Sequence, residues 1–100
     1  MTDVREHRAE IRWSPLREER GLFLVKELIQ PAWPGLEGPL GEGWSLVCRF
    51  EQTPAEQGNP STGLVHFLMD EAPHESLGAG SFLRLFDGFD EVHAVVRVLD

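Results

Sequence analysis

Residues 81–99, SFLRLFDGFDEVHAVVRVL, decide the fold class, because they contain two apolar runs joined by turn residues. Asp87-Gly88 between the runs is typical of a tight β-hairpin, since glycine accepts positive φ and the aspartate side chain caps the turn. The second run is rich in β-branched valine, which favours strands. We therefore expect an antiparallel pair of strands at 81–86 and 91–99.

The rest of the chain has the same pattern of short apolar segments separated by turn residues. The segment 22–29 could be helical by propensity, but its length and its flanks, Gly21 and Gln30-Pro31, favour a strand. Turn residues, including Pro31, Pro34 and Pro39, predict loops at 30–43 and 52–63. The remaining predicted strands are 8–13, 44–51 and 63–70. Six strands and no helix of ordinary length predict a single all-β domain over residues 1–100, a small barrel or sandwich.

The charge of the chain limits its partners. Nine Lys and Arg against seventeen Asp and Glu give 9 − 17 = −8. Such a surface repels phosphate backbones and anionic lipid, so we expect neither nucleic acid nor a membrane as the partner. Arginines crowd the first twenty residues, but glutamates interleave with them and weaken the local field.

The sequence also predicts the cellular compartment. No apolar run approaches the roughly 20 residues that span a membrane, and the charged first residues lack the apolar region of a signal peptide. A single cysteine, Cys48, leaves no internal disulfide, as is usual in a reducing cytosol. We therefore expect a cytoplasmic protein.

Three features of the sequence are candidates for chemical sites. "GAG" at 78–80 lacks the third glycine and the following helix of a dinucleotide loop, so a turn is expected there. Cys48 lies on the apolar face of its predicted strand, which indicates a buried, inert thiol. His66 and His93 would meet if their strands pair, and with Asp70 they could bind a metal or supply a general base. No carboxylate pair can be assigned acid and base roles, and no cofactor is expected.

The three tryptophans have different expected roles. Trp13 and Trp44 fall on apolar strand faces and are expected in the core. Trp33 lies between two prolines in the predicted loop 30–43, where it would either anchor a partner or pack over one mouth of the barrel. The predicted partner-binding residues are Trp33, Leu36 and Glu37.

Three segments together resemble the C-terminal β-barrel domain of elongation factor Tu and related translational GTPases. They are AEIRWSPLREERG (9–21), GWSLVCRF (43–50) and GSFLRLFDGFDEVHAVVRVL (80–99). The last is similar to the terminal ribbon of that domain at Gly80, Leu83, Leu85, Asp87, Gly88, Val92, Val96 and Val98. The resemblance covers about residues 9–99, and it implies a closed antiparallel barrel, a non-catalytic module that helps to hold aminoacyl-tRNA in the full-length factors.

The chain departs from the family where the family contacts its ligands. Glu19-Arg20-Gly21 replaces a Gly-Gly-Arg sequence, and Ser45 replaces a basic residue. His93 and Val95 stand where the last strand of the family has glycines, and the segment 52–62 is short for an extra strand pair. These residues contain no Gly-x4-Gly-Lys-Ser/Thr motif. Binding of tRNA is therefore not carried over to this chain.

We accordingly expect a stand-alone, non-enzymatic barrel that binds another protein through its acidic surface and its loop 30–43. A specific version is an inhibitor or immunity-type protein that neutralises a basic partner by electrostatic complementarity. One alternative is an accessory domain of translation that binds tRNA or the ribosome. The other is a small metal-dependent enzyme built around His66 and His93.

Overall fold

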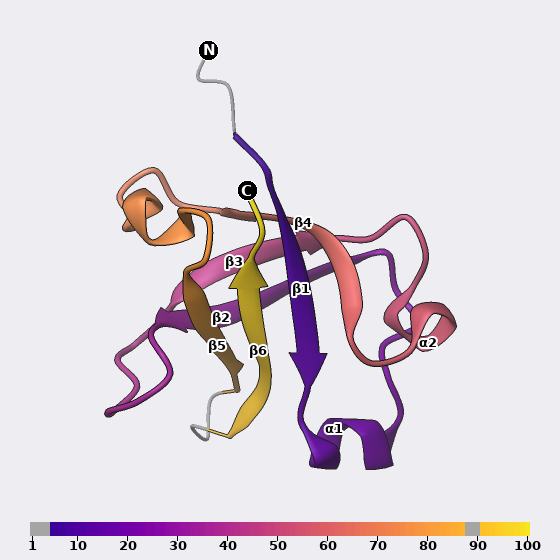
Figure 1. Ribbon diagram of the computed structural model, residues 1–100. Coiled ribbons are helices and arrows are strands. Elements are labelled where there is room, and N and C mark those ends of the chain that lie inside the picture. The colour runs from indigo at the N-terminus through magenta and orange to yellow at the C-terminus, as the bar shows by residue number, and fades with distance from the viewer. Residues whose placement is uncertain (1–4, 88–90) are drawn as a thin grey trace.

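The structure, a computed structural model, describes residues 5–87 and 91–100. Six strands close into a barrel in the order β1-β4-β3-β2-β5-β6, and every neighbouring pair is antiparallel (Figure 1). The predicted all-β, six-stranded antiparallel barrel is confirmed. The strands are β1 (His7–Trp13), β2 (Glu27–Pro34), β3 (Trp44–Arg49), β4 (Ser61–Phe67), β5 (Phe82–Phe86) and β6 (Val92–Val98).

The ribbon that decided the fold class forms as predicted. β5 pairs with β6 in a register that places Leu83 opposite Val96 and Leu85 opposite Ala94. The predicted turn at Asp87-Gly88 falls partly outside the described residues, which resume at Glu91. The turn GAG at 78–80 is confirmed, since the Ser81 amide donates to the Gly78 carbonyl over 3.0 Å and a strand follows.

Every second strand residue points into the barrel, because side chains alternate along a strand. Trp13 is buried as predicted, whereas Trp44 is half-buried and packs against the core. Cys48 is fully buried, and burial raises the pKa of its thiol to about 12, as expected for an inert thiol. The largest fully buried aliphatic side chains of the strands are Ile11, Leu46, Leu83, Leu85, Val65, Val96 and Val98.

The prediction of a strand at 22–29 is wrong in its bounds, because the observed strand lies five residues farther toward the C-terminus. β2 begins at Glu27 and continues through Pro31 to Pro34, inside the predicted loop 30–43. Proline is tolerated where a strand needs no amide donor on one side. Pro31 precedes the pairing with β5, which starts at Ala32, and Pro34 ends the strand. The two prolines are therefore compatible with a strand, and the loop begins only after Pro34.

The helical elements of the described residues are short: α1 (Pro15–Arg20), α2 (Pro54–Gln57) and a 3-10 turn, η1 (His74–Leu77). Ser14 accepts from the Arg17 amide over 3.2 Å at the start of α1, and Thr53 begins α2 with a capping box. Both caps precede a proline, a helix-start signal that was present in the sequence and was overlooked. No helix among the described residues is long and apolar enough to cross a membrane.

Candidate functional site

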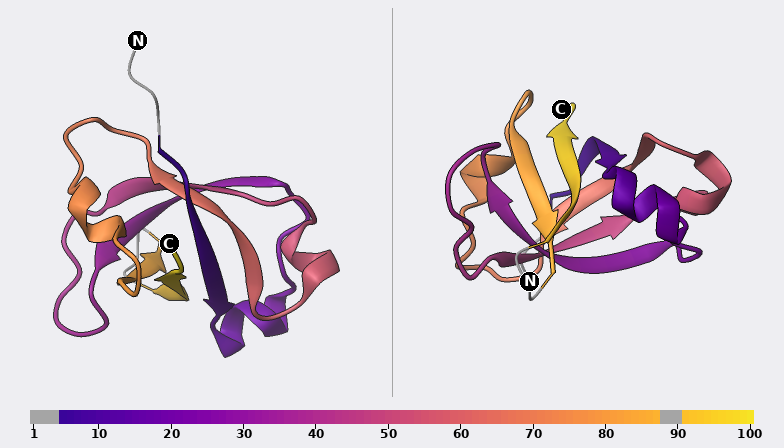
Figure 2. Two further views of the ribbon diagram at one scale, coloured as in Figure 1. Left: turned by 45° about the horizontal axis from the view of Figure 1, so that its top comes forward. Right: turned by 90° about the horizontal axis from the view of Figure 1, so that it is seen from below.

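Two long connections lie on the same side of the barrel, residues 35–43 between β2 and β3 and residues 68–81 between β4 and β5. Both are on the left in Figure 1 and in both views of Figure 2, whereas α2 is on the right. The Gly35 amide donates to the carbonyl of Phe82, the first residue of β5, over 2.9 Å and joins the first connection to the end of the second. We call residues 35–43 and 68–82 the loop face.

A shallow depression of about 710 Å³ lies between the two parts of the loop face. Leu36 is 50% exposed on one side of it, and Phe82 is 38% exposed on the other. Leu68 and Met69, farther along the loop face, are also half exposed. Exposed apolar side chains beside a depression, such as Leu36 and Phe82, are typical of interaction sites. The other lining residues are Pro34, Gly35, Glu37, Ser76, Gly80 and Ser81.

Arg84 holds the loop 35–43 in place. It lies on the outer side of β5 and is only 9% exposed, because the loop covers it. Its guanidinium donates to three backbone carbonyls, of Gly35 over 3.0 Å, of Gly38 over 3.0 Å and of Glu37 over 3.1 Å. A planar fork of donors suits this task better than an ammonium group would. The loop is thus fixed from beneath by one side chain.

Trp33 supports the same loop and is not a loop residue. It is half-buried in β2, opposite Arg84, so its predicted placement in a loop is wrong. A Cβ atom at Gly41 would lie 2.4 Å from the indole ring, so the ring packs directly against the loop backbone. Of the two interpretations of Trp33, packing describes its position better, although it packs on the outer side of the barrel and under the loop.

The other two predicted partner-binding residues, Leu36 and Glu37, are exposed on the loop face. The sequence reasoning missed Phe82 and Arg84. A signal for both was present, because strand alternation places them on the face opposite to the buried Leu83 and Leu85. That the loop 35–43 folds over Arg84 has no signal in the sequence.

The second part of the loop face is also fixed. The ring nitrogen Nε2 of His74 lies 3.1 Å from the Met69 carbonyl oxygen and 3.0 Å from that of Asp70. Both oxygens can only accept, so the imidazole donates to them. The ring also meets Phe67 edge-on, with 5.8 Å between centroids. The chain after β4 is therefore folded back onto the barrel.

The predicted meeting of His66 with His93 does not occur. β1 lies between their strands: β4 pairs with one edge of β1 and β6 with the other, so the two strands do not pair with each other. His66 Nδ1 lies 3.7 Å from a carboxylate oxygen of Glu6, and His93 Nε2 lies 3.4 Å from one of Asp87. Within residues 5–87 and 91–100, no three His, Cys, Asp or Glu residues are placed to bind one metal ion.

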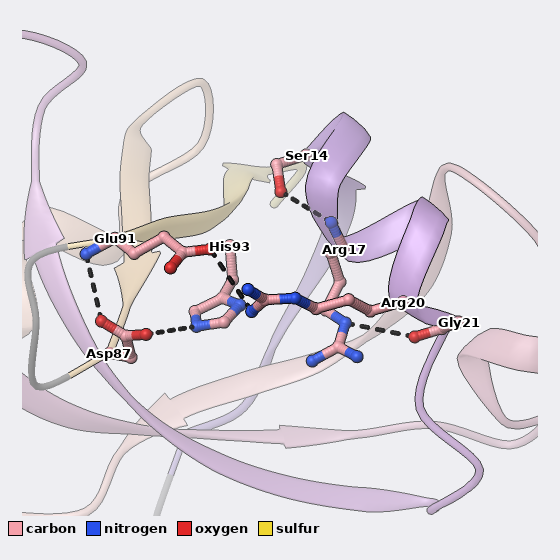
Figure 3. A network of polar contacts seen from close by, with 7 residues as sticks. All are labelled: Ser14, Arg17, Arg20, Gly21, Asp87, Glu91 and His93. Carbon is pink, nitrogen blue, oxygen red and sulfur yellow. Dashed lines mark hydrogen bonds and ion pairs between the residues drawn. The ribbon is translucent and has the colours of Figure 1, made fainter.

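The polar network around His93 fastens α1 to the end of the β5–β6 ribbon (Figure 3). Arg20 of α1 lies 3.5 Å from Glu91, and the Glu91 amide donates to Asp87 over 3.1 Å. The Ser14 hydroxyl accepts from the Arg17 amide as the cap of α1. These contacts stabilise the packing of α1 against the end of the β5–β6 ribbon.

A larger groove of about 820 Å³ crosses the barrel between β1, β4 and β3. Arg8, Lys26 and Arg49 line it, and two of these are paired: Arg8 with Asp100 at 2.8 Å and Arg49 with Glu6 at 3.1 Å. Two further carboxylates, of Glu27 and Glu51, also line the groove. Two of its three cations are therefore already paired, and the carboxylates of Glu27 and Glu51 oppose the binding of an anion.

Comparison with protein-family models, with curated proteins and with solved structures finds no match for this chain.

Proposed function

We propose that this protein is a non-enzymatic binding module that recognises another protein with its loop face. The observation that carries the proposal is the clamp of Arg84 on the carbonyls of Gly35, Glu37 and Gly38. The clamp holds Leu36 half exposed beside Phe82, at the edge of a depression.

The clamp favours binding of a partner, because a loop that is already ordered loses less conformational entropy when the partner binds. A flexible loop must be ordered when a partner binds, and that ordering subtracts from the affinity. Here Trp33 and Arg84 order the loop from beneath, so Leu36 and Glu37 are presented in one conformation. An exposed apolar pair that is fixed in position beside a depression suits a docking surface.

The proposal is tested by affinity capture from the native lysate with wild type, Leu36→Asp and Leu24→Asp, followed by quantitative mass spectrometry. Leu24 is the matched control, because it is 82% exposed and lies before β2, outside the loop face. We expect a protein that is enriched on wild type and on the control but lost on Leu36→Asp. The same set of captured proteins on all three baits, or none on any, contradicts the proposal.

The clamp itself is tested with Arg84→Met, for which Arg97→Met is the control. The first change leaves three carbonyls without their donor, which costs about 1–3 kcal/mol of folding free energy and frees the loop. Arg97 makes a half-exposed pair with Glu10 at 3.7 Å, and its loss costs about 0–1 kcal/mol. At a temperature where both variants are folded by circular dichroism, only Arg84→Met should lose the partner.

A role in translation is a weaker second candidate, supported by the resemblance and by the closed six-stranded barrel. A shared barrel does not imply a shared function. In the capture experiment the two candidates separate by adding bulk tRNA at low salt: a translation accessory should bind it, and the binding should weaken steeply with salt. The net charge of −8 predicts no binding.

A further inference from the structure

We infer that the segment recognised by the loop face is cationic and amphipathic: it inserts an apolar side chain between Leu36 and Phe82 and places Lys or Arg side chains against the surrounding carboxylates. This inference rests on the proposed function and adds the chemistry of the partner. It follows from the distribution of charge on the barrel and from the apolar walls of the depression.

The negative charge of the protein is concentrated on the loop face. Its two parts contain five acidic residues and neither Lys nor Arg. The whole chain has a net charge of −8, so the remaining residues account for −8 − (−5) = −3. All five side chains belong to exposed residues: Glu37, Glu42, Asp70, Glu71 and Glu75.

The cations of the barrel lie elsewhere or are already engaged. Arg84 is buried beneath the loop and its guanidinium is turned to backbone carbonyls. On the rest of the barrel, arginines and carboxylates form pairs, such as Arg20 with Glu91 and Arg49 with Glu6. The field at the loop face is therefore negative and is not locally neutralised, and it complements a cationic segment.

Charge alone does not describe the loop face, because apolar side chains also line its depression, beside Ser76, Ser81 and Glu37. Leu36 and Phe82 flank the depression, and Pro34 also lines it. A purely basic partner would leave these side chains in water, whereas an apolar side chain in the depression removes them from it. An apolar anchor with basic neighbours satisfies both components, in the usual arrangement of an apolar centre with a polar rim.

The inference is tested on the full chain by fluorescence anisotropy with three labelled synthetic peptides of equal length. The first is an amphipathic helix of leucine and lysine, the second is an oligolysine–serine peptide of equal charge, and the third has glutamate in place of lysine. We expect the first to bind at least about tenfold more tightly than the second, equivalent to about 1.4 kcal/mol. The third should not bind. Affinity for the first should fall as salt screens the charges.

Charge-matched variants locate the binding. Glu37→Gln/Glu75→Gln and Glu18→Gln/Glu19→Gln each remove two carboxylates, the second pair from α1. Only the first pair of substitutions should weaken the binding of the leucine–lysine peptide. Phe82→Ala should also weaken this binding, whereas Leu24→Ala should not. Equal binding of the serine–lysine peptide, or equal losses for both charge pairs, would show general attraction to an acidic protein and overturn the inference.

The proposed function and the inference about the chemistry of the partner can be contradicted independently of each other. If Leu36→Asp still captures every native protein that wild type captures, the proposed function is wrong, whatever the peptides do. If that capture is lost but the leucine–lysine peptide has no preference over the serine–lysine peptide, the loop face binds a partner of another chemistry and only the present inference is wrong.

Discussion

Arg84 shows how a residue can be assigned correctly to a strand face and still have an unexpected role. Alternation with Leu83 and Leu85 places it on the outer side of β5, where an arginine is normally solvated. In the fold it is buried, because the loop 35–43 lies over it, 46 to 49 residues away in sequence. The contact satisfies a buried charge with carbonyl dipoles, and no carboxylate in the described part of the chain lies within ion-pair distance of it.

At the same scale, Cys48 should be unreactive in the folded protein. Its burial raises the pKa of the thiol to about 12, so at pH 8 the thiol is neutral and out of reach of reagents. We expect no reaction with a disulfide reagent such as DTNB at pH 8 without denaturant, and stoichiometric reaction in guanidinium chloride. Rapid labelling of the native protein would mean that the barrel opens near β3.

Among the elements, α2 is the one whose sequence signal was clearest and was overlooked. Thr53 accepts from the Glu56 amide over 3.1 Å, and the Glu56 carboxylate accepts from the Thr53 amide over 3.2 Å. The segment 52–63 is predicted to be a loop because it is polar and carries turn residues. For β2 the error is the opposite one: Pro31 and Pro34 predict a loop, although the strand continues through Pro31 and ends at Pro34.

The capping box should make stability depend on pH. The pKa of Glu56 is lowered, first by the hydrogen bond from the Thr53 amide and then by that from the Thr53 side chain. A folded-state pKa below the unfolded value means that this stabilisation is present at neutral pH and is lost as pH falls through the acidic range. Thr53→Ala removes the N-cap hydroxyl and should destabilise by about 1 kcal/mol at pH 7.

The measurement is urea denaturation of wild type, Thr53→Ala and Glu56→Gln at pH 7 and near pH 3. The difference between wild type and each variant should shrink at the acidic pH. An equal difference at both pH values would mean that the carboxylate does not contribute to the cap.

At the scale of the whole molecule, one small interior carries the stability of the barrel, since no disulfide is possible with a single cysteine. All six strands contribute side chains to one core cluster. A domain of this size is stable by about 5–15 kcal/mol, so a single void in that interior is a large fraction of the total.

Substitution of alanine for a buried and for an exposed leucine should change the free energy of unfolding by very different amounts. Leu85 is fully buried, and Leu85→Ala should lose about 2–5 kcal/mol because the cavity cannot collapse. Leu36→Ala on the loop face should change stability by less than about 0.5 kcal/mol. Chemical denaturation midpoints with unchanged m values check both. A comparable loss at Leu36 would mean that it packs into the fold and is not a docking residue.

Local features of the protein follow from its sequence: the six strands, the β5–β6 ribbon, the buried Cys48 and the acidic surface. These depend on side-chain alternation, turn residues and composition, which are properties of neighbouring residues. The tertiary structure decided that His66 and His93 are separated by β1, and that Trp33 and Arg84 lie under the loop 35–43. Those facts depend on which distant segments pair and cover one another, and closing a long loop leaves no periodic trace in the sequence.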